Sequence, residues 1–355
     1  MKKILLIILL CPVMVNAYST SATSTTLIDT ASNRTIYANN ENEIRSVASI
    51  SKIMTAILAI ESNKLNDDVI IKDYVSKAYG SGIYIKIGEK LKLIDLVYGL
   101  LLRSGNDAAL AIANTVSNSE EEFVNLMNKK AKELNMKDTT FNNPSGLDGK
   151  VMKGNFSTSH DMAILMSYCM KNKTFRKITK TSSYKLNTNM NNYYWVNKNK
   201  LLRNYKYANG GKTGFTEIAK RTLITSAKKG NTELVVVTLN DGNDFSDHKR
   251  LYEEAFKEYK TIKIIKKGYI QIPDEKFYKN VKFYVKEKFN YTINDRDEIL
   301  IKYILDEKFK YKNNDVVGKL EVYNKKTKIF DTDIYIKIKK KKIDVIEYML
   351  GLFKW

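Results

Sequence analysis

The chain has 355 residues and carries 60 lysine or arginine residues against 39 aspartate or glutamate residues, a formal net charge of +21. This length is enough for a sizeable hydrophobic core and predicts two domains. The chain contains only Cys11 and Cys169. Because Cys11 falls in the leader described next, Cys169 would have no internal partner, which excludes a fold stabilised by disulfides.

Residues 1–17 have the layout of a secretory signal peptide. Lys2 and Lys3 precede an apolar run at 4–10, and residues 15–17 (Val-Asn-Ala) end in a small-residue cleavage pattern. We therefore expect an exported protein. Anionic lipid headgroups or an anionic cell wall suit an exported basic chain better than nucleic acid does.

Residues 18–260 alternate predicted strands and helices, which favours an α+β domain. The predicted elements are two short strands at 25–40, an apolar helix at 46–61, helices at 89–103, 107–116, 119–135 and 159–172, paired strands at 221–229 and 232–240, and a closing helix at 247–259.

Residues 261–338 alternate apolar and polar side chains with polar turns between them, which predicts a small all-β domain. Residues 339–355 form an amphipathic pattern with a wide apolar face. A helix from Lys340 to the end would be about 24 Å long, shorter than the roughly 30 Å hydrocarbon core of a bilayer. We expect it to lie in the membrane interface as a peripheral anchor; the alternative is a terminal helix docked on the β domain.

The apolar helix at 46–61 raises a chemical question, because it carries Ser49 and Lys52 at its start. Four Ser-x-x-Lys pairs occur in the chain: Ser49/Lys52, Ser182/Lys185, Ser226/Lys229 and Ser246/Lys249. Only the first pair opens an apolar helix, where residues three apart share one face. Burying an ammonium is costly unless it is paired or loses its proton. A buried Lys52 is therefore expected to present a neutral amine to Ser49.

Two further motifs follow in the sequence. Ser104-Gly105-Asn106 separates two predicted helices, and Lys212-Thr213-Gly214 begins a predicted strand. Taken alone, the first motif is an ordinary helix–helix turn and the second an ordinary strand start. Their order after the Ser49/Lys52 pair makes both more informative.

Ser-x-x-Lys, Ser-x-Asn and Lys-Thr-Gly, in this order, are the active-site set of penicillin-binding proteins and serine β-lactamases. Over most of residues 20–260 the sequence resembles the low-molecular-weight D-Ala-D-Ala carboxypeptidases, in stretches such as SVASISKIMTA, SGNDAALAIA and ANGGKTGFTEIAK. The resemblance implies a β-lactamase/transpeptidase-like catalytic domain, an antiparallel sheet with helices, followed by the small β domain and the tail helix.

The resemblance also implies roles for individual residues. Ser49 would be the nucleophile, Lys52 its general base, and Ser104 a proton relay toward the leaving amine. Asn106 would hold the substrate's backbone amide. The backbone N–H groups of Ser49 and Phe215 would form the oxyanion hole.

The terminal carboxylate of the substrate would meet a second group of residues. Lys212 would contribute positive charge and Thr213 a hydroxyl, while Gly214 would leave the strand edge open for the peptide. Lys198 stands where a basic carboxylate-binding residue is expected, but as a lysine it lacks the bidentate fork of an arginine.

The implied reaction removes the terminal D-Ala from peptidoglycan stem pentapeptides through an acyl-enzyme at the extracytoplasmic face of the membrane, with β-lactams as inhibitors. A transpeptidase or endopeptidase using the same site, or a non-catalytic wall- or membrane-binding homologue, is an alternative. A β-lactamase is disfavoured because no Glu-x-x-Leu-Asn loop occurs.

The two histidines, His160 and His248, are 88 residues apart and belong to no metal-binding pattern, so neither a metal nor a cofactor is expected. We expect His160 at the start of a helix and His248 on the surface. The sequence leaves the oligomeric state open.

Overall fold

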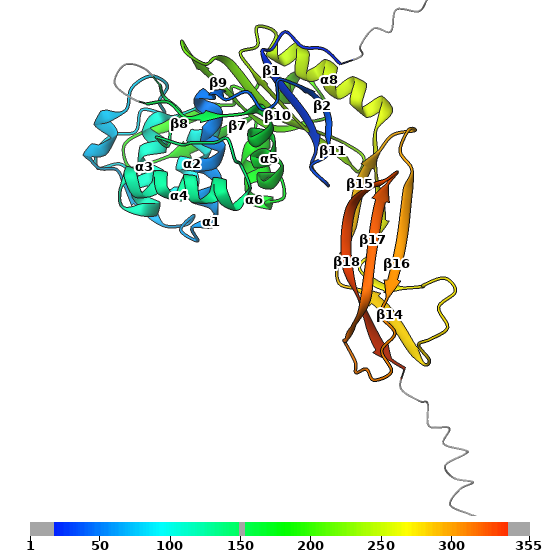
Figure 1. Ribbon diagram of the computed structural model, residues 1–355. Helices are drawn as coiled ribbons and strands as arrows, with labels where there is room; N and C mark the ends of the chain where they lie inside the picture. The colour runs from blue at the N-terminus through cyan, green and yellow to red at the C-terminus, as the bar shows by residue number, and fades with distance from the viewer. Residues whose placement is uncertain (1–17, 149–152, 340–355) are drawn as a thin grey trace, which may run out of the picture. The chain divides into compact units, whose positions relative to one another are not determined.

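The computed structural model describes residues 18–148 and 153–339, which form two compact units, one ending at Tyr259 and the other beginning at Lys260 (Figure 1). The predicted signal peptide and residues 340–355 of the predicted tail helix lie outside the described residues. Within the described part of the chain, no helix is long and apolar enough to cross a membrane.

A five-stranded antiparallel sheet forms the centre of the first unit, in the order β2-β1-β11-β10-β9. The strands are β1 (Ser24–Asp29), β2 (Thr35–Asn39), β9 (Ala208–Thr216), β10 (Lys220–Lys229) and β11 (Thr232–Leu239). The two predicted strand pairs are confirmed as the hairpins β1–β2 and β10–β11. Strand β9 lies at one edge of this sheet, where an extended peptide can lie against it.

The two faces of the sheet bury different side chains, because successive residues of a strand point to opposite faces. Ile28 and Val235 belong to the core that includes helix α5 (Ser159–Cys169), whereas Leu27 and Val236 pack in the core that includes α8 (Asp244–Glu258). The first unit is therefore layered, with α8 on one face of the sheet and the larger group of helices on the other (Figure 1).

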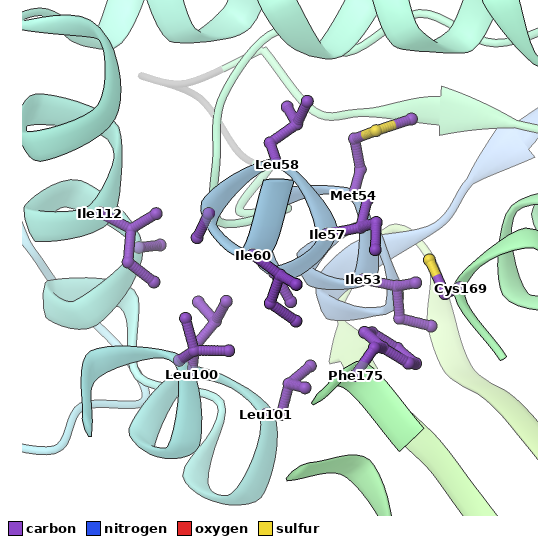
Figure 2. Close-up of a cluster of buried hydrophobic side chains, with 14 of the residues drawn as sticks. Ile53, Met54, Ile57, Leu58, Ile60, Leu100, Leu101, Ile112, Cys169 and Phe175 are labelled. Carbon is purple, nitrogen blue, oxygen red and sulfur yellow. The ribbon is translucent and has the colours of Figure 1, made fainter. Parts of the chain in front are cut away.

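Helix α1 (Lys52–Glu61) lies in the middle of the larger helical layer, and nine of its ten residues are buried. Figure 2 shows its isoleucines among side chains from other helices, including Leu101, Ile112 and Phe175. The neighbouring helices are α5, α2 (Leu93–Arg103), α3 (Asn106–Ser117), α4 (Glu120–Glu133) and α6 (Lys173–Lys180). Cys169 is buried in the same core.

Short elements complete the first unit. They are β3 (Arg45–Ser46), η1 (Ala48–Ser51), β4 (Asp68–Ile70), η2 (Asp73–Lys77), β5 (Lys90–Lys92), β6 (Phe156–Ser157), β7 (Ser183–Asn187), β8 (Asn192–Val196) and α7 (Leu201–Asn204). The predicted helix at 46–61 is thus shorter than expected. Its first part is the 3-10 turn η1, and Ser49 lies in that turn rather than in the helix.

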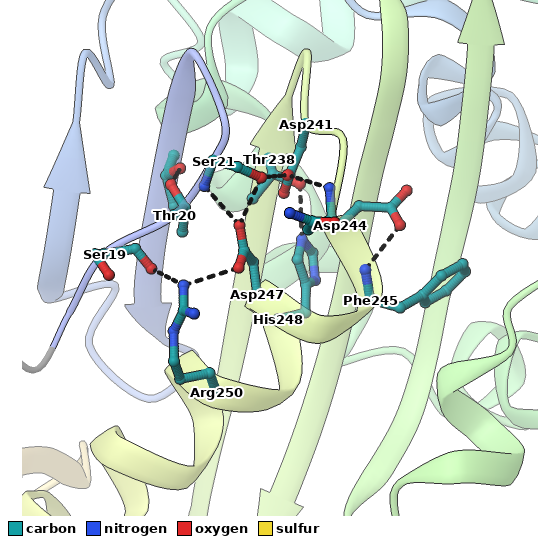
Figure 3. Close-up of polar contacts among 12 residues, drawn as sticks. Ser19, Thr20, Ser21, Thr238, Asp241, Asp244, Phe245, Asp247, His248 and Arg250 are labelled. Atoms are coloured by element: carbon teal, nitrogen blue, oxygen red, sulfur yellow. Dashed lines mark hydrogen bonds and ion pairs between the residues drawn. The ribbon is translucent and has the colours of Figure 1, made fainter.

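A polar network fixes the start of α8 (Figure 3). The Asp247 carboxylate accepts hydrogen bonds from the backbone N–H of Ser21 at 2.6 Å and from Arg250 at 2.8 Å, and Asp241 accepts from the Ser21 hydroxyl at 2.6 Å. Ser21, which precedes β1, is thereby tied to both the β11–α8 connection and the first turn of α8.

The prediction that His248 lies on the surface is wrong, because its side chain is fully buried between α8 and the sheet. Nδ1 contacts the hydroxyl of Thr225 at 2.7 Å, and Nε2 contacts the hydroxyl of Thr238 at 3.0 Å. Burial lowers the pKa of His248 to about 3. The imidazole is therefore a neutral, fully hydrogen-bonded core group.

The second unit is entirely β-structure in its described residues, as the sequence predicts. A five-stranded antiparallel sheet has the order β13-β14-β18-β17-β16, and β12 pairs with β15. The strands are β12 (Lys260–Ile265), β13 (Gly268–Ile270), β14 (Val281–Val285), β15 (Phe289–Ile293), β16 (Ile299–Leu305), β17 (Val316–Asn324) and β18 (Thr327–Ile338). Its own core includes Val285, Leu320 and Ile336.

Candidate active site

A cleft of about 350 Å³ in the first unit contains most of the predicted site residues. Its lining consists of Ser49, Ser81, Ser104, Lys198, Lys200, Thr213, Gly214, Phe215, Arg221, Asp244 and Phe245. Three segments far apart in the sequence thus meet at one place: the turn before α1, the end of α2, and the edge strand β9. Lys52 and Lys212 are not part of the lining because both are buried behind it.

The turn that carries Ser49 has an unusual backbone conformation. Ala48 has a φ of 49°, in the left-handed region that residues other than glycine seldom occupy. Gly146 packs directly against it, and a Cβ added to Gly146 would lie 2.0 Å from the Ala48 carbonyl oxygen. The Ser51 hydroxyl donates to the same carbonyl at 2.7 Å. The turn is therefore held in place from outside by the loop around Gly146.

Lys52 is fully buried, and its side-chain nitrogen reaches three oxygens. Nζ lies 2.9 Å from the Ser49 hydroxyl and 2.7 Å from Asn106 Oδ1, and it also donates to the Ser145 carbonyl. Burial lowers the pKa of Lys52 to about 7, with the charge of Lys198 acting in the same direction and Asp107 opposing the shift. Near neutral pH a large fraction of Lys52 is therefore a neutral amine in hydrogen-bond contact with Ser49.

The loop at 141–148 provides a contact that the motifs do not reveal. Asn143 Oδ1 accepts hydrogen bonds from the backbone N–H groups of Ser145 at 3.0 Å and of Gly146 at 2.7 Å, and Asn155 accepts from the backbone N–H of Asn143 at 3.1 Å. These bonds aim the Ser145 carbonyl at Lys52. The Asn-Pro-Ser-Gly sequence does predict a turn, but the partner of its carbonyl is a tertiary contact.

Ser104 lines the cleft, whereas Asn106 lies behind it. Ser104 ends α2 with a φ of 66° and lines the cleft. Asn106 begins α3 behind it, and its side chain has protein partners at both ends, because Oδ1 accepts from Lys52 and Nδ2 donates to the Tyr79 carbonyl at 2.6 Å. In this structure Asn106 therefore orients Lys52.

The Lys-Thr-Gly motif lies on β9, where the edge strand passes the Ser49 turn. A Cβ on Gly214 would lie 2.4 Å from the Thr222 hydroxyl and 3.0 Å from the backbone nitrogen of Ser49. Only glycine lets the strand approach the turn so closely. Phe215, the next residue, lines the cleft with an exposed ring.

Lys212 is buried beside these groups, and its Nζ donates to the Thr213 carbonyl at 2.6 Å. Burial lowers the pKa of Lys212 well below its ordinary value, and the charges of Lys52 and Lys198 lower it further. An anion bound in the cleft would reverse part of this effect, because a nearby negative charge favours the protonated amine.

Lys198 lines the cleft from the segment after β8, and its Nζ donates to the Ser81 hydroxyl at 3.1 Å. The loop that carries Ser81 is fixed by Asp107, whose carboxylate accepts from the backbone N–H groups of Ile83 at 3.0 Å and Tyr84 at 2.6 Å. Sequence reasoning did not find Ser81, because nothing in the local pattern at 78–88 distinguishes it from a loop serine.

Arg221, Asp244 and Phe245 line the cleft as well, and no motif included them. In the sequence, Arg221 lies in a predicted strand, and Asp244 only precedes a predicted helix. Among residues 18–148 and 153–339, no group of three or more His, Cys, Asp or Glu side chains could hold a metal ion. The chemistry that the described residues provide is thus a hydroxyl beside a neutral amine, backbone donors, and cationic side chains.

Comparisons with known proteins show which family the chain belongs to. The family model described as D-alanyl-D-alanine carboxypeptidase matches residues 12–243. The carboxypeptidase DacF of Bacillus subtilis is 36% identical over 256 residues, an alignment that includes 70% of this chain and spans 65% of the relative's length.

Solved structures extend the similarity to the fold. Penicillin-binding protein 5 of Haemophilus influenzae has a TM-score of 0.75 with 23% identity, covering 92% of this chain and 99% of the other. A DD-transpeptidase of Streptomyces has a TM-score of 0.63 with 28% identity, covering 67% of this chain and 99% of the other.

Proposed function

This chain belongs to the D-alanyl-D-alanine carboxypeptidase family, and on that premise we propose that it removes the terminal D-Ala from peptidoglycan stem pentapeptides through an acyl-enzyme on Ser49. The observation that carries the proposal is the 2.9 Å contact between the Ser49 hydroxyl and a buried Lys52 whose pKa is about 7. A serine hydroxyl is a weak nucleophile until a base removes its proton, and this contact provides the base.

In the proposed reaction, the neutral Lys52 amine takes the Ser49 proton while Oγ attacks the carbonyl of the penultimate D-Ala. The backbone N–H groups of Ser49 and Phe215 stabilise the negative charge that develops on the carbonyl oxygen. The proton passes to the leaving D-Ala amine by way of Ser104, and the C–N bond breaks. Water then attacks the acyl-enzyme ester, releases the tetrapeptide, and restores the Ser49 hydroxyl.

We assign the binding of the substrate's terminal carboxylate to Lys212, Thr213 and Lys198. The first two lie on β9 beside Gly214, and Lys198 lines the same cleft. Asn106 holds Lys52 and keeps a second lone pair on Oδ1 for the substrate's backbone amide. β-Lactams, which resemble the acyl-D-Ala-D-Ala end, are expected to acylate Ser49.

The test combines labelling with product release. The protein is incubated with a fluorescent penicillin, and free D-Ala is measured after incubation with an N-acylated pentapeptide. S49A should lose both signals. S182A, which alters another Ser-x-x-Lys pair, should keep both. Label without D-Ala release from the unaltered protein would identify a non-catalytic binder and contradict the proposal.

Transpeptidation is the second candidate, because one of the similar structures is a DD-transpeptidase. Both reactions share the acyl-enzyme and differ in whether water or an amine accepts the acyl group. Adding a D-amino acid or a second stem peptide as acceptor, and separating the products by mass, distinguishes them. A majority of acyl-transfer product at millimolar acceptor would favour the transpeptidase.

We further propose that the protein is exported and acts at the extracytoplasmic face of the membrane, bound peripherally through residues 339–355. The support is the pattern of the sequence, namely the leader at 1–17 and the basic, amphipathic tail. Comparing D-Ala release from lipid-linked and soluble pentapeptide, with and without residues 339–355, tests it. Equal activity of both forms on the lipid-linked substrate would contradict the anchor.

A further inference from the structure

The cleft contains a cationic side chain, Arg221, to which the proposed reaction assigns no role. Arg221 lies on β10, directly across from Phe215 of β9, while Thr222 pairs with Gly214 and Leu223 with Thr213. Along the sheet, Arg221 is therefore one residue past the Gly214 position, on the side away from Thr213.

Arg221 is anchored by one nitrogen only. Nη2 donates to both oxygens of Asp244, at 2.7 and 2.8 Å. In the described part of the chain, no other nitrogen of this guanidinium has a hydrogen-bond partner, and its side chain is 48% exposed. Nε and Nη1 therefore keep their N–H donors for a ligand in the cleft.

The anchor itself is rigid. The Asp244 side chain is only 5% exposed and also accepts a hydrogen bond from the backbone N–H of Phe245 at 2.7 Å. It belongs to the first turn of α8, which the network in Figure 3 ties to Ser21. The backbone of Arg221 is fixed as well, because its carbonyl accepts from the N–H of Asp241 at 3.1 Å. The guanidinium is thus held in place before a substrate arrives.

The proposed reaction fixes which part of the substrate reaches Arg221. The terminal carboxylate lies at Lys212 and Thr213, and the attacked carbonyl lies at Ser49 beside Gly214. An extended peptide advances about 3.3 Å per residue, so the residue before D-Ala-D-Ala continues past Gly214 to the Phe215 and Arg221 side.

Resting on this proposed function, we propose that Arg221 determines specificity at the third residue of the stem peptide by binding a free carboxylate on its side chain. Either of the free donors, Nε or Nη1, can donate a charge-assisted hydrogen bond to a carboxylate. A side chain ending in an amine alone meets an unfavourable environment, because the cleft lining includes Lys198, Lys200 and Arg221 against a single carboxylate, Asp244, which is already paired. The preferred substrate therefore has a dicarboxylic diamino acid at this position rather than lysine.

The test uses three N-acylated peptides ending in D-Ala-D-Ala. Their third residues are diaminopimelate with a free side-chain carboxylate, the same residue with that carboxylate amidated, and lysine. We expect kcat/KM for D-Ala release to be about tenfold higher for the free carboxylate than for the amide, as for a charged hydrogen bond in a half-exposed site. In R221Q this ratio should fall to near one. R221K, which keeps the charge but has a single nitrogen for both Asp244 and the ligand, should give an intermediate ratio.

K220Q is the matched control. Lys220 is the neighbouring cation, exposed and outside the cleft lining, with Glu217 as its ion-pair partner at 3.6 Å. Removing its charge should leave the ratio unchanged. A ratio near one in the unaltered protein, a ratio that survives in R221Q, or an equal loss in K220Q would overturn the inference. Failure to release D-Ala from all three peptides would instead overturn the proposed function.

Discussion

The pH dependence of Ser49 acylation follows directly from the burial of Lys52. With a pKa of about 7, the amine is neutral in about a tenth of the molecules at pH 6, half at pH 7 and nine-tenths at pH 8. The acylation rate constant for a β-lactam should therefore rise close to tenfold per pH unit below pH 6 and level off above pH 8.

The size of the pKa shift distinguishes this mechanism from one in which Lys52 has an ordinary pKa. If Lys52 kept the usual lysine pKa of 10.5, only about 0.03% of the amine would be neutral at pH 7, and the rate would keep rising up to pH 10. The difference between the two pKa values corresponds to about 5 kcal/mol between the protonation states. It arises chiefly because the fully buried Nζ has no carboxylate among its three hydrogen-bond partners.

The assay is stopped-flow or quenched labelling with a β-lactam whose own charge does not change between pH 5 and 10. K52R is the matched variant, since an arginine keeps a positive charge but cannot act as a base in this range; it should lose acylation at every pH. K185R, in an exposed Ser-x-x-Lys pair, should behave like the unaltered protein. A rate that still rises tenfold per unit between pH 8 and 10 would refute the reasoning.

Three more predictions follow from the contacts around the site. G146A places a Cβ 2.0 Å from the Ala48 carbonyl at a φ of 76°, so it should cost about 2–4 kcal/mol of unfolding free energy and slow acylation; a denaturant titration with unchanged stability would contradict this. His248 is buried with a pKa lowered to about 3, so the unfolded chain binds its proton first as pH falls below about 6.5. The free energy of unfolding should drop by about 3 kcal/mol between pH 7 and 4 from this group, and H248Q should flatten that drop. D107N removes an acceptor for the N–H groups of Ile83 and Tyr84 and a charge that raises the pKa of Lys52. The midpoint of the pH dependence of acylation should therefore move to lower pH in D107N. An unchanged midpoint would show that the charge of Asp107 does not raise the pKa of Lys52.

The motif residues were predictable because their side-chain types are informative. A lysine at the start of an apolar helix needs an explanation from the sequence alone, and Ser104 and Lys212 gain meaning from their order after it. The β10–β11 hairpin was predictable for a different reason, because the runs at 221–229 and 232–240 bracket a Gly-Asn turn.

Other parts of the site depend on contacts that no local pattern encodes. Ser145 acts through its backbone carbonyl, which every residue possesses, so its identity carries no signal for Lys52. His248 was misassigned because its burial depends on Thr225 and Thr238, which lie on different strands of the sheet. Arg221 resembles any polar residue at a strand start until the α8 turn brings Asp244 beside it.

The buried lysines of the site lower the stability of the fold, and the hydrophobic cores around them offset this cost. Because burial lowers the pKa of Lys52, the folded protein releases a proton that the unfolded chain keeps between about pH 10.5 and 7, and stability falls as the pH decreases through that range. Lys212 adds a cost of the same sign. The extensive cores around α1 and on both faces of the sheet supply the compensating burial. A bound substrate carboxylate would favour the protonated form of Lys212, which burial otherwise disfavours. Part of the electrostatic cost carried by the empty cleft therefore becomes affinity for an anionic peptide end.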